Sequence, residues 1–162
     1  MKTFEELKEE LLNRAKNANA CQNGYKMGLD AKNKADLLKA ITANWFWVLI
    51  DARIVDAIYL EENFTEEELS EAGIYTRKCH EVRAVSFACG SATVKACGSA
   101  TVKACDSATV RAYDSATVEA YDESYVEDCT GNIRPRYDYA IVKDYHNHKI
   151  YIRKGKFEII EV

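Results

Sequence analysis

Residues 88–127 read ACGSATVK, ACGSATVK, ACDSATVR, AYDSATVE and AYDESYVE, an eight-residue unit that decays in the following DCTGNIRP. Self-similarity at a fixed short period is typical of arrays whose units stack on their neighbours. Within a unit, Ala92, Val94 and Ala96 alternate with polar residues, which is the period of a β-strand. A helical array is disfavoured because Ser, Thr, Val and Gly are poor helix formers. The repeat therefore predicts short parallel strands wound into a β-solenoid.

The repeat also predicts the size of one turn of the coil. One octad is too short to enclose an interior, so two octads form the smallest rung, with one strand on each of two facing sheets. Residues two octads apart then stack at about 4.8 Å, and residues 88–129 supply about 2.6 rungs. The valines from Val94 to Val126 form a thin core with the alanines beside them. The chain bends at the position held first by Gly90 and later by Asp106.

Five of the six cysteines lie between Cys79 and Cys129, and four of them share one position of the repeat. The two-octad rung stacks Cys89, Cys105 and Tyr121 in one ladder and Cys97, Tyr113 and Cys129 in the other. A metal ligand or an obligatory disulfide could not be replaced by tyrosine, and this cysteine spacing is not that of a zinc site. We therefore expect reduced, space-filling thiols, with no metal and no cofactor. The alternative is a Cys89–Cys105 disulfide between stacked rungs.

Residues 1–75 predict a helical region. Thr3 and Glu6 match a capping box, and the apolar residues that follow have helical spacing. Further helices are expected from about residue 34 to 50, from 53 to 60, and from Thr65 to Gly73. The consecutive aromatic residues 45–47 must point in different directions around a helix, so they cannot all face one core.

Residues 136–162 alternate between apolar and polar again, with turn-like breaks, and predict a three-stranded antiparallel meander. The expected fold is therefore α+β: a helical region at 1–75, a short two-sheet solenoid of octapeptide repeats at 76–135, and an antiparallel β-strand cap at 136–162. The two flanking regions would cover the open ends of the solenoid, which otherwise expose unpaired backbone groups. We expect one continuous body.

Charge is unevenly distributed along a chain whose net charge is −4. Residues 88–111 are net basic and residues 112–129 net acidic, so the solenoid should have one end of each sign. Pairing of these ends would give a homodimer; the alternative is a mixed, solvated surface. A mildly acidic chain has no bulk electrostatic reason to bind nucleic acid or an anionic membrane. With no membrane-spanning stretch and no signal-peptide pattern, we expect a cytoplasmic protein.

Catalytic motifs are absent from the sequence: it has no P-loop, no dinucleotide fingerprint and no nucleophile elbow. A catalytic centre needs a unique constellation in a pocket, whereas a near-identical repeat builds a uniform wall. We therefore expect no enzyme activity. A uniform wall suits the recognition of a macromolecule.

The first hypothesis is a non-catalytic protein-binding module that acts through the solenoid face, for example a small inhibitor of the type carried by phages or mobile elements. Tyrosines are good interface anchors, and acidic residues accompany them in the last repeats. The candidate binding residues are Tyr113, Tyr121, Tyr125, Tyr137, Tyr139, Glu119, Glu127, Asp114 and Asp122.

As a stack of small side chains at a short period, the array resembles pentapeptide-repeat proteins and other short-repeat β-solenoids. The resemblance covers about a quarter of the chain, at residues 88–127, and is one of architecture, because the period is eight instead of five. Some pentapeptide-repeat proteins are acidic mimics of DNA that inhibit DNA-handling enzymes. The resemblance thus implies a second hypothesis, an acidic nucleic-acid mimic that blocks such an enzyme.

A third hypothesis is surface or ice binding through a grid of hydroxyl groups. If Ser91 and Thr93 both face outward along one strand, their hydroxyls lie about 6.7 Å apart, with rungs about 4.8 Å apart. Regular grids of this kind occur in β-solenoid ice-binding proteins. Only two or three rungs contribute to each face, and charged residues flank them.

Overall fold

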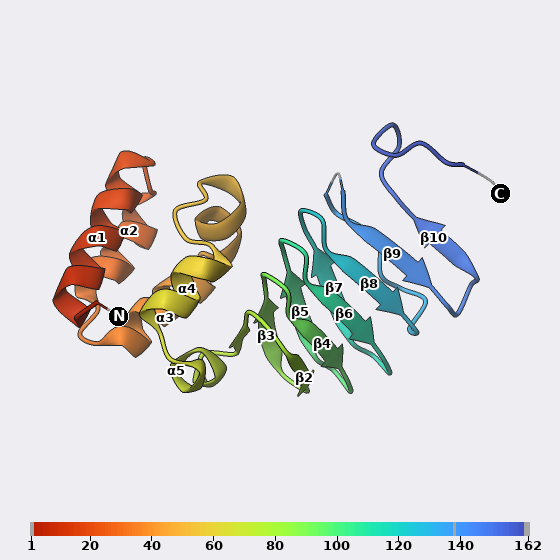
Figure 1. The fold of residues 1–162 in the computed structure, drawn as a ribbon, viewed down its shortest axis with the longest axis horizontal. Coiled ribbons are helices and arrows are strands. Elements are labelled where there is room, and N and C mark those ends of the chain that lie inside the picture. The colour runs from red at the N-terminus through yellow and green to blue at the C-terminus, as the bar shows by residue number, and fades with distance from the viewer. Residues whose placement is uncertain (1, 138, 161–162) are drawn as a thin grey trace. The chain divides into compact units, whose positions relative to one another are not determined.

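The computed structural model describes residues 2–137 and 139–160, so residues 138, 161 and 162 of the expected strand cap lie outside the described residues. The chain forms two compact units, Met1–Gly73 and Ile74–Val162. The first is helical and the second is a β-solenoid (Figure 1). This α+β composition is the one that the sequence predicts.

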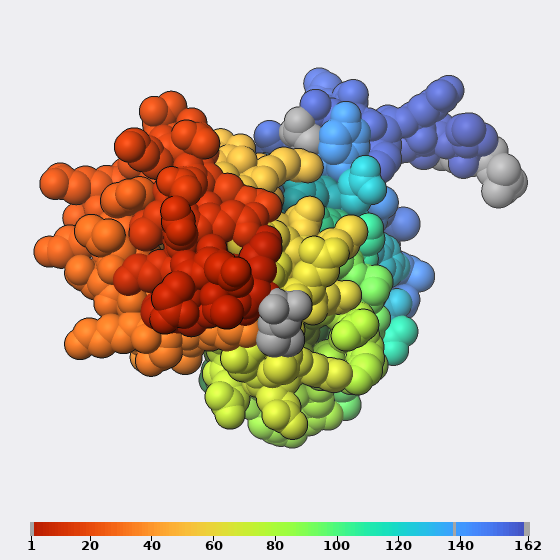
Figure 2. All heavy atoms as spheres, turned by 60° about the vertical axis from the view of Figure 1, so that its left-hand side comes forward, coloured from red at the N-terminus to blue at the C-terminus, as the bar shows by residue number. Residues whose placement is uncertain are grey.

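The helical unit contains five α-helices and one π-helix. They are α1 (Phe4–Asn17), α2 (Gln22–Asp30), α3 (Lys34–Ala43), the π-helix η1 (Phe46–Asp51), α4 (Ala57–Asn63) and α5 (Glu66–Glu71). Both expected capping boxes are present: Thr3 caps α1 with Glu6, and Thr65 caps α5 with Glu68. In Figure 2, α1 and α2 form much of the surface of this unit that faces the viewer, in red and orange.

Two features of the helical unit differ from the sequence prediction. Helix α2 was not expected, because it contains Gly24 and Gly28, and glycine is a poor helix former. The single helix expected at 34–50 is divided into α3 and η1. The aromatic residues at the division do diverge, since Trp45 is buried and Phe46 is exposed.

The second unit is a coil of parallel strands with about four turns. Its strands are β1 (Ile74–Tyr75), β2 (Cys79–Val82), β3 (Val85–Ala88), β4 (Thr93–Ala96), β5 (Thr101–Ala104), β6 (Thr109–Ala112), β7 (Thr117–Ala120), β8 (Tyr125–Asp128), β9 (Ile141–Asp144) and β10 (Lys149–Tyr151). One sheet has the order β1-β3-β5-β7 and the other β10-β9-β8-β6-β4-β2. From β1 to β8 successive strands thus alternate between two facing sheets, whereas β8, β9 and β10 follow one another in the six-stranded sheet.

The register confirms the two-octad rung. Val94 pairs with Val110 on the next turn, and Val102 pairs with Val118. The same offset continues from β8 to β9, where Val126 pairs with Val142. Residues at one position of the repeat therefore form straight ladders along the coil.

Over the repeats, the core between the two sheets consists of valine and alanine side chains. Val94, Val102, Val110 and Val126 are fully buried, as are the alanines two positions before and after the first three of them. Two facing strands leave no room for larger side chains between them, and small residues fill such a space without cavities. This requirement explains why Ala and Val vary least from octad to octad.

The corners explain the change from glycine to aspartate along the array. The residue at this position has a positive φ in every octad, from 61° at Gly90 to 52° at Asp106 and 48° at Asp122. Glycine adopts this conformation freely, and aspartate is among the few other residues that enter it. The carboxylate Oδ2 of Asp106 accepts a hydrogen bond from the Gly90 backbone N–H one turn earlier, at 3.0 Å. Each aspartate thus anchors the corner of the preceding turn.

The coil begins close to the expected residue 76 and differs from the sequence prediction at its C-terminal end. Strands β2 and β3 precede most of the first octad but lie within the expected range 76–135, with pairings such as Cys79 to Thr93, and β1 adds residues 74–75. At the other end β9 is parallel to β8 and belongs to the coil, and only β10 pairs in antiparallel fashion. The expected third strand of the meander, near Phe157, is not a strand among the described residues. The alternating pattern of residues 137–142 belongs to one more strand of the coil. A coil strand and a meander strand alternate with the same two-residue period, so the pattern cannot distinguish them.

Stability should depend on the stacked valines. Replacing Val110 by alanine removes two methyl groups from the middle of the core and leaves a cavity, so we expect a loss of about 2 kcal/mol in the free energy of unfolding. Urea unfolding followed by circular dichroism measures it. The matched control is Thr117→Ala, an exposed position on the neighbouring strand; an equal loss in both variants would contradict the described core.

The corners give a second prediction. Asp114 has a φ of 55° and accepts the Gly98 N–H at 2.8 Å. Both Asp114→Gly and Asp114→Ala lose the hydrogen bond, but the alanine variant keeps a Cβ in the left-handed region and the glycine variant does not. The alanine variant should therefore be less stable than the glycine variant by about 1 kcal/mol in urea unfolding. If alanine is the more stable of the two, the positive φ at this corner is wrong.

Candidate functional site

The tyrosines expected to bind a partner lie at different depths. Tyr113 is half-buried at a corner, with the Lys95 ammonium 5.6 Å from its ring centre. Tyr125 begins β8 and is half-buried. Tyr139 is 49% exposed and makes an edge contact with Phe157, ring centres 6.1 Å apart. Of these three tyrosines, only Tyr139 has an exposed side chain.

The other two tyrosines come together beside β7. Tyr121 is buried, and its ring centre lies 4.7 Å from that of Tyr137. The Tyr121 hydroxyl donates to Glu119 at 2.8 Å, and Arg136 pairs with the same carboxylate at 3.2 Å. Burial, followed by the hydrogen bond to Glu119, raises the pKa of Tyr121 above its usual range. These contacts hold residues 136–137 against the last strand of the four-stranded sheet.

The acidic candidate residues are engaged within the solenoid. Arg111 pairs with Glu127 at 2.6 Å and Lys103 with Glu119 at 4.0 Å, each pair joining adjacent turns. The carboxylate of Asp122, like that of Asp114, accepts a backbone N–H from the turn before, in this case from Asp106. Each residue lies beside the residue two octads later, on the next turn of the coil. Basic side chains of the first octads are therefore adjacent to acidic side chains of the later ones.

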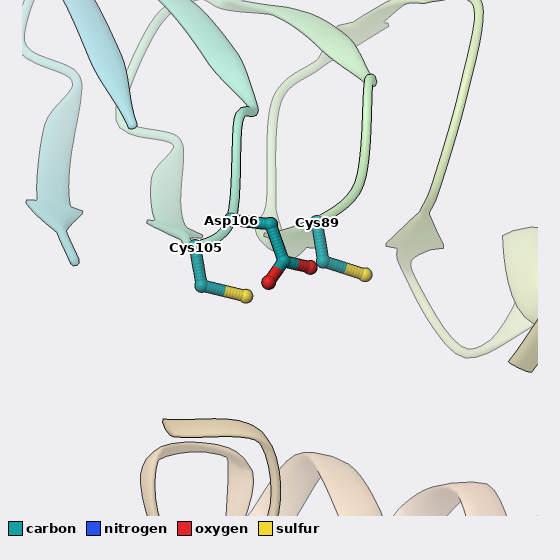
Figure 3. Close-up of side chains that lie close together, drawn as sticks. All are labelled: Cys89, Cys105 and Asp106. Atoms are coloured by element: carbon teal, nitrogen blue, oxygen red, sulfur yellow. The ribbon is translucent and has the colours of Figure 1, made fainter. Parts of the chain in front are cut away.

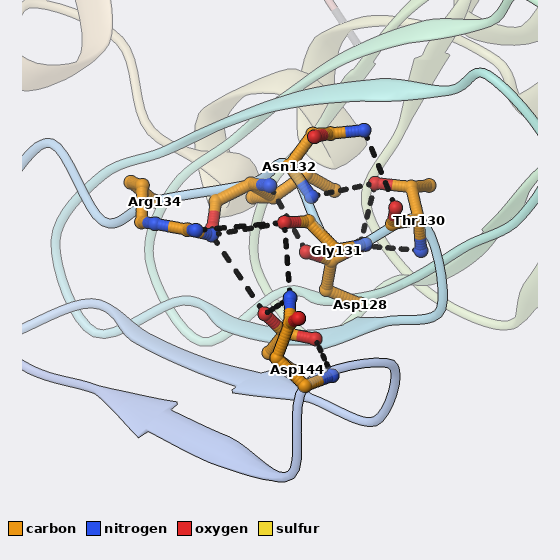
Figure 4. A network of polar contacts seen from close by, with 8 residues as sticks. Asp128, Thr130, Gly131, Asn132, Arg134 and Asp144 are labelled. Atoms are coloured by element: carbon orange, nitrogen blue, oxygen red, sulfur yellow. Dashed lines mark hydrogen bonds and ion pairs between the residues drawn. The ribbon is translucent and has the colours of Figure 1, made fainter.

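Two aspartates occupy the inward-facing alanine position of the repeat at the end of the coil. Asp128 and Asp144 are register partners and both are buried. The Asp128 carboxylate accepts N–H groups of Thr130 and Gly131 on Oδ1 and that of Ile133 on Oδ2 (Figure 4). It thereby anchors the loop that leaves β8. The one sign of this network in the sequence is an aspartate at an alanine position of the repeat.

Asp144 is held in a similar way by the next loop. It accepts the Asn147 backbone N–H and the Asn147 side-chain amide, both at 2.8 Å, and lies 3.8 Å from Arg134. Asn147 also donates to the Gly131 carbonyl, so the two loops are linked. The hydrogen bond from the Asn147 side chain is the largest cause that lowers the pKa of Asp144.

Several apolar side chains are exposed in the C-terminal part of the second unit. Ile150 is 64% exposed on β10, which ends the six-stranded sheet, and Tyr145 is 44% exposed in the preceding turn. Tyr139, Ile159 and Ile160 are also exposed in this part of the unit. The segment after β10 (Figure 1) returns to the chain before β9, where Phe157 contacts Tyr139 and the Arg153 guanidinium donates to the Arg136 carbonyl at 3.3 Å. Residues 130–162 carry more basic than acidic groups, including the exposed Lys149 and Lys154.

The hydroxyl grid is smaller than the sequence predicts. Ser91 lies in the turn before β4, so the strand begins at Thr93 and the serines are corner residues. The threonine ladders have two members each, and Thr109 is followed by Tyr125 on the next turn. The hydroxyls of Thr101 and Thr117 lie 3.0 Å apart and bond to each other.

The helical unit contains an apolar cavity of about 340 Å³. It lies among α1, α2, α3 and η1, and its lining includes Leu11, Ile41 and Val48 together with Gly24 and Gly28 of α2. None of the candidate binding residues from the sequence is in it. Among the described residues no helix is long and apolar enough to cross a membrane.

The cysteines of the array are free thiols, as expected, and Cys89 and Cys105 occupy adjacent turns of one corner. Both are fully buried. Asp106 lies beside them (Figure 3). The hydrogen bond to Cys89, followed by burial, raises the pKa of the Cys105 thiol far above its usual range.

No protein-family model, curated protein or solved structure shows significant similarity to this chain. The residues and their geometry therefore carry the functional argument alone.

The Asp144 network predicts a pH dependence. Because the pKa of Asp144 is lower in the folded chain than in the unfolded one, its carboxylate stabilises the fold at neutral pH. The ordinary pKa of an aspartate carboxyl is 3.8, and that of Asp144 in the folded chain is lower. The stabilisation is therefore lost as the pH falls below 3.8 and through the pKa of the folded chain. Asp144→Asn should therefore be less stable than wild type at pH 7, and the difference should shrink in urea unfolding at about pH 3.

The matched control is Asp30→Asn, an exposed aspartate at the end of α2 in the helical unit. It should behave as wild type at both pH values. A difference between Asp144→Asn and wild type that is the same at both pH values would contradict the role given to the carboxylate.

Proposed function

We propose that this chain is a non-catalytic protein-binding module, and that it docks its partner at the C-terminal end of the solenoid. The observation that carries the proposal is the exposed edge strand β10, with Ile150 on its surface and the exposed rings of Tyr139 and Tyr145 in the same part of the unit. An edge strand that carries exposed apolar side chains favours pairing with a strand from another chain.

The charges around this surface select the partner. The basic excess of residues 130–162, with Lys149 on β10 itself, favours an extended acidic segment. A second copy of the chain would bring the same basic strand, and like charges oppose each other across such a pair. Self-association through opposite ends of the array also loses its electrostatic basis, because those charges are paired within the molecule. We therefore place the partner in another protein.

The inhibitor hypothesis follows as a special case. If the acidic segment belongs to a functional surface of a host protein, covering it would inhibit that protein without any chemistry. The nucleic-acid mimic would need free carboxylates on the array, whereas Glu119 and Glu127 are paired with basic side chains. The exposed apolar and basic side chains therefore favour protein binding over nucleic-acid mimicry.

The test is affinity purification from the native host with the full chain as bait, comparing wild type with Ile150→Asp and Val85→Asp. Val85 is a matched control because it is 61% exposed on β3 of the same solenoid. The proposal predicts a protein that wild type and Val85→Asp enrich alike. Ile150→Asp should weaken its binding at least about tenfold, because an acidic residue then faces an acidic segment.

The enriched protein is then purified and its affinity measured at two salt concentrations. Binding through the basic surface should weaken as salt rises. A partner whose binding is indifferent to Ile150→Asp, or the enrichment of no protein by any of the three baits, would overturn the proposal. So would a dimer of the chain itself that Ile150→Asp dissociates.

A further inference from the structure

Three metal-binding side chains meet at one corner of the solenoid. Cys89 and Cys105 are stacked on adjacent turns, and Asp106 follows Cys105 at the corner (Figure 3). Their two Sγ atoms and a carboxylate oxygen all lie within 4.8 Å of one another. We propose that Cys89, Cys105 and Asp106 form a binding site for a thiophilic metal ion, with Zn²⁺ as the ion expected in the cell.

This constellation occurs once in the array. At the opposite corner Cys97 and Cys129 are separated by Tyr113, so no two thiols occupy adjacent turns there. Asp106 is also the first aspartate at its position, since Gly90 and Gly98 precede it. The exchange of cysteine for tyrosine indicates space-filling for the ladder as a whole. It does not apply to the pair that precedes Tyr121, where both thiols and the carboxylate are present together.

The donor atoms suit zinc in number, kind and distance. Zinc takes thiolate sulfur at about 2.3 Å and carboxylate oxygen at about 2.1 Å in a tetrahedral site, which places two sulfurs about 3.8 Å apart. Side-chain rotations that move the atoms by about 1 Å therefore close the site, and the fixed spacing of adjacent strands permits this. Three protein ligands leave the fourth position to a water molecule.

The surroundings of the carboxylate are already ordered. The Gly90 backbone N–H donates to Asp106 Oδ2 at 3.0 Å, and the Asp106 backbone N–H donates to Asp122. Hydrogen bonds of this kind orient a metal ligand and increase its affinity for the ion. The other carboxylate oxygen of Asp106 remains available to the metal. On binding, each thiol loses its proton to solvent, and the two thiolates with the carboxylate leave the site one negative charge in excess of Zn²⁺.

The test uses the full chain, stripped of metal with a chelator and kept reduced. Zn²⁺ is titrated by calorimetry, and Cd²⁺ is titrated with detection of its thiolate absorption in the ultraviolet. We expect one tight equivalent of either ion, release of about two protons per ion, and a thermal midpoint that rises with added Zn²⁺. Cys89→Ser and Cys105→Ser should abolish the thiolate absorption of the tight site.

A pair of aspartate variants keeps the test independent of misfolding. Asp106→Asn should weaken Zn²⁺ binding at least about tenfold. Asp114→Asn is its matched control, because Asp114 forms the same bond to the preceding turn, from the Gly98 N–H at 2.8 Å, without a stacked thiol pair. Asparagine tolerates a positive φ, so both variants retain the corner. Cys97→Ser removes a buried thiol of the other corner and should leave binding unchanged.

Three results would overturn the proposal. The first is the absence of stoichiometric Zn²⁺ and Cd²⁺ binding by the reduced wild type. The second is tight binding that survives Cys89→Ser or Cys105→Ser, which would assign the ion to the exposed cysteines Cys21, Cys79 and Cys129. The third is an equal effect of Asp106→Asn and Asp114→Asn.

Discussion

The stacking of small apolar side chains two octads apart is the interaction on which the second unit depends. Val94, Val110, Val126 and Val142 form one continuous ladder across four turns of the six-stranded sheet. Each valine is buried by its neighbours in the ladder and by the facing sheet, so no single octad has a core of its own. The interior consequently tolerates few residue types, and the corners and outward positions are free to vary.

The variation at those free positions follows the same register. A basic residue in one octad is paired with an acidic residue two octads later: Lys103 with Glu119 and Arg111 with Glu127. The corner aspartates bond to the turn that precedes them, and the thiols of Cys89 and Cys105 stack for the same reason. Polar interactions in this solenoid are thus arranged along the coil axis, and this arrangement is one reason why we propose that a partner docks where the coil ends.

The sequence predicted the coil because its period is short and its interior positions hardly change. The two-octad rung, both Cys/Tyr ladders and the two capping boxes could all be derived from spacing. Helix α2 could not, since Gly24 and Gly28 hide its helical pattern. The engagement of Glu119 and Glu127 follows from the same two-octad register, which places Lys103 beside Glu119 and Arg111 beside Glu127. The role of Asp128 follows from a carboxylate inside the coil, and its partners are backbone groups that no sequence pattern marks.

The two-octad register is tested most directly by cross-linking outward positions. Lys95 and Arg111 are register partners on adjacent turns of one sheet, whereas Lys103 lies one octad from Lys95 on the facing sheet. After mild oxidation, mass spectrometry should find a disulfide in Lys95→Cys/Arg111→Cys and none in Lys95→Cys/Lys103→Cys. A disulfide that forms in the second variant and not in the first would contradict the two-sheet coil.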